Sequence, residues 1–341
     1  MKYPGLRVRP GLTRATRVSL AALIVLAGCS DDTGFQTPEA RLPALDGGPP
    51  GPDGPRPQFD SKVGTPVVVS VATFNVRNFF DEVDDPKHFD DVLTPKQVQD
   101  KIKALGVALR HLAADVVALQ EVEHRPLLDR LNGSQLGSLG YKHVRLVEGN
   151  DARGIDVALL SRFPIPSAMT HKGDRFPGVG SDTKTYGFSR DCLEATIEPA
   201  PGRKLLLLIN HLRANSWKDP QDAIKRRKAQ AAQVRRIADN VLKHKPNANL
   251  AVIGDLNDVP ASDTLKLIQN GKPFLFDLVT LLPPSQRWTT FYDKKQTQID
   301  YILVAPGLRA DLVDGSVQVL HQNAFKTTSD HYPVKARFRL Q

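Results

Sequence analysis

Residues 67–75 read VVVSVATFN, an almost unbroken apolar and β-branched run that ends on an asparagine. β-Branched residues favour strands, and a short apolar run of this kind predicts a strand buried on both faces. Similar runs that end on polar residues occupy 114–122, 204–211 and 250–255. Further strands are expected at 155–160, 192–197, 298–304 and 334–340.

Two amphipathic stretches predict helices between these strands. Thr94 is followed by Pro95, the arrangement of a helix N-cap with proline at the first helical position, and apolar residues then recur every three or four positions as far as Leu109. Residues 219–243 predict a longer helix with a basic face. Strands outnumber helices and do not alternate with them regularly. We therefore expect an α/β fold in which two sheets pack face to face with helices outside.

The composition excludes several classes of protein. Of the 341 residues, 40% are hydrophobic, which is enough for a sizeable core and too many for a wholly disordered chain. Two cysteines exclude a disulfide-stapled scaffold and a cysteine-rich zinc module. No uncharged apolar run reaches about 18 residues, so a multi-span membrane protein is excluded. The 46 Lys and Arg outnumber the 37 Asp and Glu, and this net charge of +9 suits a polyanionic substrate.

The N-terminus has the features of an export signal. Residues 1–28 place basic side chains before a short apolar segment, and Leu26-Ala27-Gly28-Cys29 resembles the bacterial lipoprotein signal, in which the cysteine is lipidated. Ser30, in place of aspartate, favours the outer membrane or cell surface. Residues 29–65 are rich in Pro, Gly and Asp and predict a disordered tether. We expect an extracytoplasmic catalytic domain at 66–341 that is lipid-anchored to a bacterial membrane; a plain signal peptide is the alternative.

Polar side chains gather where the predicted strands end. Strand ends are where a scaffold presents reactive groups to solvent. Six such clusters in one chain predict a single site assembled at one rim of the fold. They are Asn75, Gln120-Glu121, Asn210-His211, Asp255 with Asn257, Asp300, and Asp330-His331.

Seven motifs, in this order along 66–341, resemble the endonuclease/exonuclease/phosphatase superfamily, which has the deoxyribonuclease I-like fold. Within it, residues 150–156 (NDARGID) look like those of bacterial secreted nucleases. The resemblance implies a four-layer α/β/β/α sandwich of two mixed β-sheets flanked by helices, and a metal-dependent phosphodiester hydrolase. The motifs are ATFNVR (72–77), LQEV (119–122), GIDVALL (154–160), INH (209–211), GDLN (254–257), QIDY (298–301) and SDHYPV (329–334).

The resemblance implies a metal site made of oxygen ligands. Glu121 would bind the metal directly, Asn75 would support the metal and the phosphate, and Asp330 would bind the metal or one of its waters. Hard oxygen donors favour Mg²⁺, for which Mn²⁺ can substitute. The number of metal ions, one or two, stays open.

The same resemblance assigns the acid–base and phosphate-binding groups. His331 would contact the scissile phosphate, and Asp300 would orient its ring and keep it cationic. Asp255 would position or deprotonate the attacking water, and Asn257 would bind a phosphate oxygen.

Four further residues complete the predicted site. His211 would protonate the leaving group or bind phosphate, and Asp156 would orient the His211 ring. Arg77 and Arg190 would bind substrate phosphates, because a planar guanidinium matches phosphate with two parallel hydrogen bonds.

These assignments favour a nuclease that acts on DNA, with RNA as an alternative substrate and no obligate protein partner. Endonucleolytic and exonucleolytic cleavage both remain open. Two other functions stay open as well: a phospholipid or inositol-phosphate phosphoesterase of the same superfamily, and a non-catalytic surface binding protein with this fold.

Overall fold

The apolar run that ends at Asn75 lies in the middle of a six-stranded sheet. In the computed structural model, which describes residues 65–292 and 294–341, β1 (Val67–Phe79) pairs antiparallel with β16 (Val334–Leu340) and parallel with β2 (Val116–Val122). The signal, Cys29 and nearly all of the tether lie outside the described residues. The sheet continues with β4 (Asp156–Ser161) and β3 (His143–Leu146) beyond β2, and with β15 (Gln318–Val319) beyond β16.

The second sheet also has six strands, and β10 (Leu250–Asp255) lies inside it. β10 pairs parallel with β9 (Arg203–His211) and antiparallel with β14 (Asp300–Val304). The remaining strands are β8 (Cys192–Ala200) and β5 (Ser167–Thr170) beyond β9, and β11 (Phe276–Asp277) beyond β14. Every strand expected from the sequence is present, with ends that differ by a few residues.

The two sheets pack face to face and bury a shared core between them. Val71 and Ala118 of the first sheet share one core with Leu207, Ile253 and Ile302 of the second, and all five are fully buried or nearly so. Because side chains alternate along a strand, the other face needs its own cover. Helices supply it, which explains why the strands are apolar at consecutive positions.

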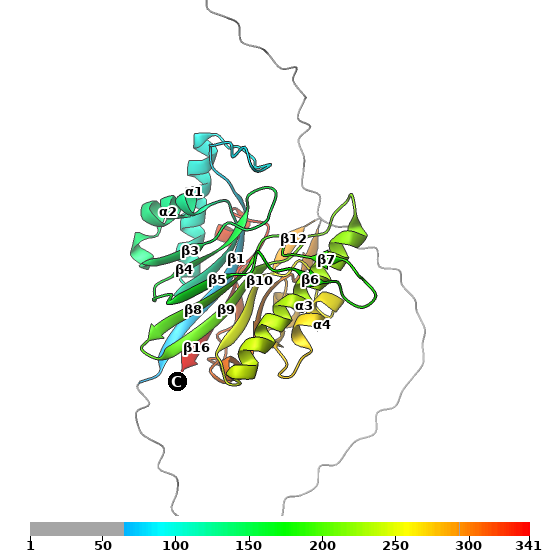
Figure 1. Ribbon diagram of the computed structural model, residues 1–341. Coiled ribbons are helices and arrows are strands. Elements are labelled where there is room, and N and C mark those ends of the chain that lie inside the picture. The colour runs from blue at the N-terminus through cyan, green and yellow to red at the C-terminus, as the bar shows by residue number, and fades with distance from the viewer. Residues whose placement is uncertain (1–64, 293) are drawn as a thin grey trace, which may run out of the picture. The chain divides into compact units, whose positions relative to one another are not determined.

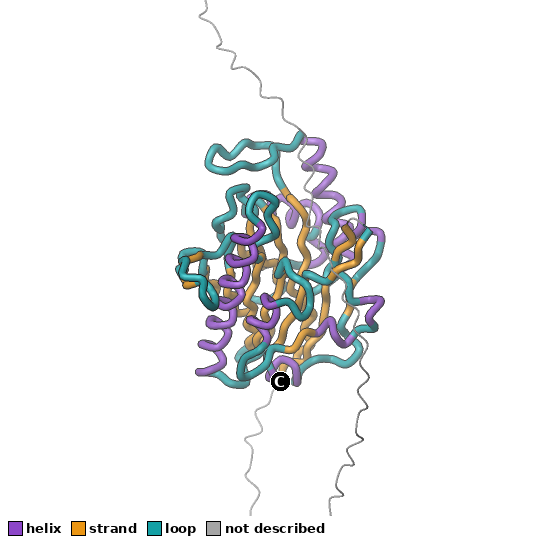
Figure 2. Tube along the Cα trace, turned by 90° about the vertical axis from the view of Figure 1, so that its right-hand side faces the viewer, coloured by secondary structure: helices purple, strands orange, loops and turns teal. Residues whose placement is uncertain are grey.

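Helices cover the outer face of each sheet. α1 (Pro95–Leu112) and α2 (Arg125–Gln135) pack on the first sheet, and α3 (Pro220–His244) and α4 (Asp263–Gln269) pack on the second. Figure 1 shows the two helix pairs on opposite sides of the strands, and the strands run between them in Figure 2. α1 begins as predicted, because Thr94 and Gln97 form a capping box. The fold is the four-layer α/β/β/α sandwich that the resemblance implied.

Short elements fill the connections. Within residues 65–292 and 294–341, no helix is long and apolar enough to cross a membrane. The short elements are β6 (Phe176–Pro177), β7 (Thr185–Tyr186), β12 (Thr290–Tyr292), β13 (Lys295–Thr297), α5 (Pro306–Ala310), α6 (Asn323–Lys326), and single 3₁₀ turns at Gly137–Leu139, Leu278–Leu281 and Pro284–Gln286.

The basic face predicted for α3 is largely engaged in ion pairs. Arg227 pairs with Asp258 at 3.1 Å and, from the same helix, Lys228 pairs with Asp263 at 2.6 Å. Arg235 is buried and pairs with Asp239. These cations hold neighbouring loops and helix turns in place, so this face is not a free basic surface.

Candidate active site

Strand register in the second sheet brings three predicted site residues into one row. Asp255, the last residue of β10, is paired with His211 on β9 and with Asp300 on β14. Gly254, just before it, has φ +133°, and a Cβ there would lie 2.0 Å from the backbone oxygen of Asn210. Only glycine permits this close approach of the two strands, which places Asp255 beside His211.

A bulge in the first sheet turns Glu121 towards the same edge. Pairing with both neighbouring strands shifts register around this residue, whose φ is +66°. Its carboxylate accepts hydrogen bonds from the Asn78 backbone N–H at 2.8 Å and from Asn75 Nδ2 at 3.2 Å. A left-handed backbone is costly for glutamate, and such strain is commonly found at functional sites.

Two contacts join the sheets at this edge. Asn75 Nδ2 donates to Asp255 Oδ2 at 3.0 Å. From the loop before β16, His331 Nδ1 donates to Asp300 Oδ2 at 2.9 Å, and its Nε2 lies 3.9 Å from Asp255 Oδ2. The structure therefore brings Asn75, Glu121, His211, Asp255, Asp300 and His331 together, as the strand-end pattern predicted.

Neighbouring carboxylates keep the His331 ring protonated and positively charged. Burial opposes its charge, but Asp300, Asp255 and Asp330 outweigh that effect and raise the pKa of His331 to about 10. The ring is thus an imidazolium at neutral pH, with Nδ1 committed to Asp300. This electrostatic balance matches the orienting role predicted for Asp300.

The environment of Asp255 suits a proton acceptor, and the environment of His211 keeps its ring neutral. Burial and the nearby Asp300 carboxylate raise the pKa of Asp255 to about 7. Burial, together with Arg190 and Arg153, lowers the pKa of His211 well below its usual value, so its ring is neutral. His211 Nε2 lies 3.5 Å from Asp255 Oδ2, and its Nδ1 has no hydrogen-bond partner within the described part of the chain.

Asn257 completes the turn after β10. Its backbone N–H donates to Asp255 Oδ1 at 2.8 Å, with φ +53°, and its Nδ2 donates to the Leu212 carbonyl at 3.0 Å. One amide hydrogen of Asn257 is used in this contact, and the other is free to meet a ligand. The turn therefore orients the Asp255 carboxylate and presents an amide beside it.

Arg77 and Asp330 lie at the exposed side of the site. Arg77 Nε is 3.6 Å from Asp330 Oδ2, and 53% of the arginine side chain is accessible. Ser329 Oγ donates to the Asn75 carbonyl at 2.8 Å, which holds the loop that carries Asp330 and His331 against β1. Arg77 is therefore accessible from solvent at this edge of the site, and its role in binding phosphate stays a prediction.

Arg190 is not placed as the sequence predicted. Only 3% of its side chain is exposed, its Nε pairs with Asp151 at 2.7 Å, and its Nη1 donates to the Leu212 carbonyl at 3.1 Å. A buried guanidinium committed to a carboxylate does not act as an accessible phosphate ligand. Arg190 instead supports the Leu212 carbonyl that also receives Asn257.

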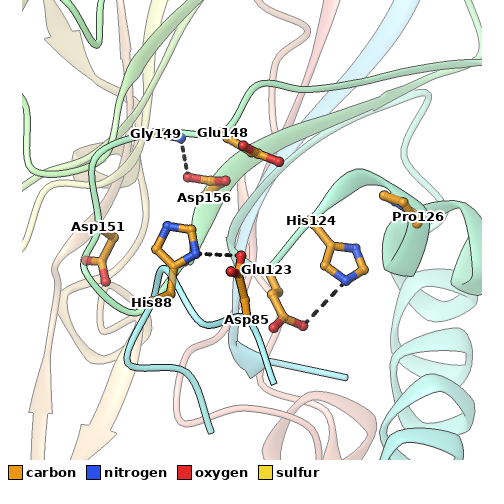
Figure 3. Close-up of a pocket in the computed structure, with 10 residues that line it drawn as sticks. Asp85, His88, Glu123, His124, Pro126, Glu148, Gly149, Asp151 and Asp156 are labelled. Atoms are coloured by element: carbon orange, nitrogen blue, oxygen red, sulfur yellow. Dashed lines mark hydrogen bonds and ion pairs between the residues drawn. The ribbon is translucent and has the colours of Figure 1, made fainter. Parts of the chain in front are cut away.

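The expected pairing of Asp156 with His211 is absent among the contacts of the described residues. Asp156 Oδ1 accepts the Gly149 backbone N–H at 2.6 Å, and the carboxylate lines a cavity of about 250 Å³ with Glu123, Glu148 and His88 (Figure 3). Burial raises the pKa of Asp156 to about 8. The alternation along β4 thus directs Asp156 to this acidic cavity and away from a role as orienter.

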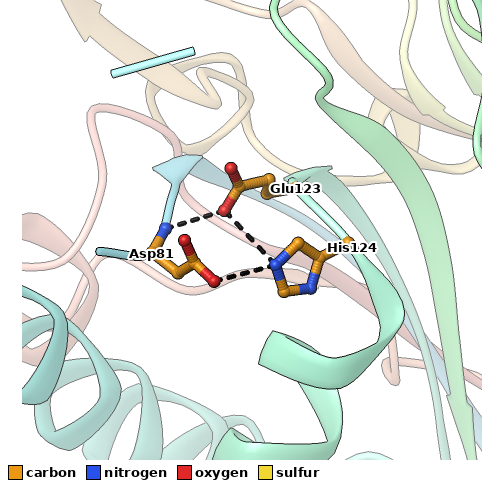
Figure 4. Close-up of side chains that lie close together, drawn as sticks. All are labelled: Asp81, Glu123 and His124. Atoms are coloured by element: carbon orange, nitrogen blue, oxygen red, sulfur yellow. Dashed lines mark hydrogen bonds and ion pairs between the residues drawn. The ribbon is translucent and has the colours of Figure 1, made fainter. Parts of the chain in front are cut away.

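A second cluster beside that cavity has the residue types of a metal site. Asp81, Glu123 and His124 lie close together in Figure 4. His124 Nδ1 accepts the Leu127 N–H as the N-cap of α2, so the proton of the neutral ring must sit on Nε2, which donates to Asp81 Oδ2 at 2.9 Å. Neither nitrogen has a lone pair left for a metal, and the cluster is a satisfied hydrogen-bond network.

The oxygen donors around Glu121 do fit a divalent cation. Within the described ranges, the only basic side chain within 4 Å of its carboxylate is His211, which is neutral. Lys101 and Arg190 act on its charge only from beyond that distance, so no cation pairs with it directly, and a hard cation would balance it. Asp255, Asp300 and His331 also lie within ligand distance of one another, but there the His331 cation already pairs with the carboxylates.

Lys101 is a site residue that the sequence analysis missed. From α1, its Nζ donates to the carbonyls of Val76 at 2.7 Å, Arg77 at 2.9 Å and Thr328 at 2.8 Å. One ammonium thus fastens the last residues of β1, after Asn75, to the loop that carries Asp330. The available signal was its position between Val98 and Leu105 on the apolar stripe of the helix, where a charged side chain needs partners.

Comparisons with known proteins support the fold. Human nocturnin, whose catalytic domain was solved with a bound sulfate anion, is 20% identical over 80% of this chain and 95% of that one, with a TM-score of 0.54. TDP2 from Caenorhabditis elegans is 17% identical over 80% and 74%, with a TM-score of 0.53. A Beutenbergia cavernae endonuclease/exonuclease/phosphatase is 21% identical over 80% and 72%, with a TM-score of 0.52.

These solved structures support the fold alone, because all three identities are low. No curated protein matches the chain in a sequence search. A family model does match it, over residues 70–332, which is most of the chain and includes every site residue from Asn75 to His331. The chain therefore belongs to the endonuclease/exonuclease/phosphatase family, whose members hydrolyse phosphate ester bonds and generally use divalent metal ions.

Proposed function

We propose that this chain is a Mg²⁺-dependent phosphodiester hydrolase that cleaves nucleic acid, with DNA as the favoured substrate. One observation carries the proposal: the Glu121 carboxylate, which has no cationic partner within 4 Å among the described residues, lies in the same cluster as a cationic imidazole, His331, and a carboxylate with a pKa near 7, Asp255. Cleavage of a phosphodiester requires charge neutralisation, a proton acceptor for water and stabilisation of the phosphate oxygens.

The metal would be held by Glu121 with the help of Asn75 and Asp330. When bound, a divalent cation neutralises phosphate charge and stabilises the negative charge that develops during displacement. All three side chains offer oxygen atoms, which is the donor set that Mg²⁺ and Mn²⁺ prefer. The Asn78 N–H fixes the Glu121 carboxylate before any metal arrives.

The protein's own groups divide the remaining work. Asp255 accepts the proton of the attacking water, since its pKa of about 7 matches that task at neutral pH. His331 donates an Nε2–H hydrogen bond to a phosphate oxygen while Asp300 holds its Nδ1. His211 is neutral and acts as a hydrogen-bond donor to the phosphate or the leaving oxygen, without carrying charge.

The choice of nucleic acid rests on charge and accessibility. Arg77 is half-exposed at the rim, and the chain as a whole is basic. The sulfate bound to nocturnin is a tetrahedral oxyanion, the chemical class to which a phosphate belongs. A phospholipid or inositol-phosphate substrate would use the same reaction centre, so direct assay must decide between these substrate classes.

We also propose that the enzyme is exported and lipid-anchored at Cys29. The support is the basic and apolar N-terminal segment that ends in Leu26-Ala27-Gly28-Cys29. Cells that express the full chain should incorporate labelled fatty acid into it, and Cys29→Ala should abolish the label. A wild-type chain without label would refute the anchor and would leave the catalytic proposal intact.

The catalytic proposal is tested with the detergent-solubilised full chain on four substrates: covalently closed plasmid DNA, RNA, sphingomyelin and an inositol phosphate. We expect plasmid cleavage with Mg²⁺ or Mn²⁺, none with chelator, and a sharply raised Mg²⁺ requirement in Glu121→Gln. Asp129→Asn, on the outer helix α2, is the matched control carboxylate. Cleavage of sphingomyelin or inositol phosphate without cleavage of DNA or RNA would refute the nuclease assignment. No turnover of any substrate would favour a non-catalytic binding protein.

A further inference from the structure

The turn at residues 151–154 holds one carboxylate between two arginines. Asp151 Oδ2 pairs with Arg190 Nε at 2.7 Å. Asp151 Oδ1 accepts both the backbone N–H of Arg153 at 2.9 Å and its Nε at 3.2 Å. One negative charge therefore serves two positive charges, and these three side chains together carry a net positive charge.

The two arginines differ in accessibility. The side chain of Arg190 is 3% exposed, whereas that of Arg153 is 38% exposed. The Nε tether to Asp151 fixes the plane of the Arg153 guanidinium, and its Nη2 group has no partner among the residues that the structure describes. A guanidinium fixed at one edge and open at the other is suited to bind an oxyanion with little loss of side-chain entropy.

Arg153 also lies beside the reaction centre. Its Nη1 is 3.4 Å from Asn78 Oδ1, and the backbone N–H of Asn78 donates to Glu121 at 2.8 Å. The residue before Asn78 is Arg77, the other exposed arginine of the site. The charge of Arg153 is felt at His211, where it contributes to the low pKa of that ring.

We propose that Arg153 binds a phosphate that flanks the scissile one, in the role that the sequence had suggested for Arg190. This inference rests on the proposed function as a nucleic-acid hydrolase, because only a polyanionic chain supplies a flanking phosphate. Arg190 acts indirectly, because it holds the Asp151 carboxylate in the position that orients the Arg153 guanidinium.

The test compares a long and a minimal substrate in the full chain. Arg153→Ala should raise KM for a 20-base-pair duplex about tenfold and reduce its log–log salt slope by about 0.9, the contribution of one phosphate contact. Bis(4-nitrophenyl) phosphate has a single phosphate and none that flanks it, so its kcat/KM should fall by a clearly smaller factor than that of the duplex. Arg153→Lys keeps the charge but loses the Nε tether; it should keep the salt slope and show an intermediate KM.

Arg162→Ala is the matched control. Arg162 also pairs with an aspartate, Asp115, at 2.8 Å and is 34% exposed, but it follows β4 at the end opposite Asp156. It should behave as wild type on both substrates. An Arg153→Ala variant with wild-type KM and salt slope on the duplex, or with equal losses on both substrates, would overturn the inference while the nuclease assignment stands. A wild-type chain that neither binds nor cleaves the duplex would overturn both.

Discussion

Replacing Lys101 with methionine tests how the two loops of the site are held together. Methionine keeps most of the length and the apolar stem, and it removes the three hydrogen bonds to Val76, Arg77 and Thr328. Hydrogen bonds to charged groups contribute about 1.5–3 kcal/mol each, so the low end gives a gross loss of about 5 kcal/mol. The opposing effect is burial of the ammonium, which lowers the pKa of Lys101 to about 8.

The pKa of Lys101 determines both the net loss of folding stability in Lys101→Met and how that loss depends on pH. A fall in the pKa from 10.5 to about 8 corresponds to a net cost of about 3 kcal/mol for keeping the ammonium charged, after the attraction by Glu121 and Asp330 has offset part of the burial. Lys101→Met should therefore destabilise the fold by about 2 kcal/mol at pH 7. Between pH 8 and 10.5 the unfolded chain holds the Lys101 proton and the folded protein does not, so wild-type stability rises with pH there. The gap between wild type and variant should widen by about 2–3 kcal/mol from pH 7 to pH 10.

The assay is denaturant unfolding of both proteins at pH 7 and pH 10 in chelator. Lys103→Met, an exposed position on the same helix, controls for loss of a lysine in general. Because Lys101 holds the Asp330 loop, its variant should also need more Mg²⁺ for half-maximal cleavage, which the control should not. A stability gap that is constant or narrower at pH 10 would refute the assigned burial of the ammonium.

Two other substitutions probe the reaction centre. In Asp300→Asn, the pKa of His331 should fall from about 10, because burial of the ring remains and the main opposing charge is lost. NMR titration of the ring in metal-free protein measures this shift, and an unchanged titration would contradict the ion pair. The pKa of His331 is higher in the folded protein than in the unfolded chain, so protonation of its ring stabilises the fold. This stabilisation is complete below about pH 6.5 and is lost as the pH rises towards 10. Gly254→Ala should cost several kcal/mol or prevent folding, since its Cβ meets the Asn210 oxygen at 2.0 Å. Gly133→Ala, in α2 with open space around it, should instead stabilise by about 0.5–1 kcal/mol in thermal unfolding.

The fold was predictable because both faces of its strands are buried. An apolar residue at nearly every position of 67–74 is explained only by cover on two sides, and the layers of sheet and helix supply it. The main site residues were predictable for a related reason. Asp255 and Asp300 stand at strand ends and Asn75 ends the apolar run of β1, and parallel or antiparallel pairing then places these positions at one edge.

Lys101 was not predictable in the same way because its partners are backbone carbonyls. A carbonyl has no sequence signature, and the loops that present these three are far from Lys101 along the chain. The helical stripe shows only that a charge falls where apolar residues are expected. Which groups satisfy that charge depends on loop conformations, including the left-handed Arg77 and Asn78, that no local pattern specifies.

The roles of Arg190 and Arg153 were not predictable either, because the sequence does not show which arginine side chain is buried. Both arginines are near an acidic residue in the sequence, and both follow motif-like segments. Residue type and spacing therefore do not distinguish one arginine from the other. Asp151 separates them: it accepts the Arg153 backbone N–H in a tight turn, and this geometry leaves one guanidinium at the surface and draws the other inside. A phosphate ligand must be accessible, and accessibility is decided by the turn around Asp151. The substrate-binding arginine is therefore selected by the conformation of residues 151–154, although both arginines are needed to build it.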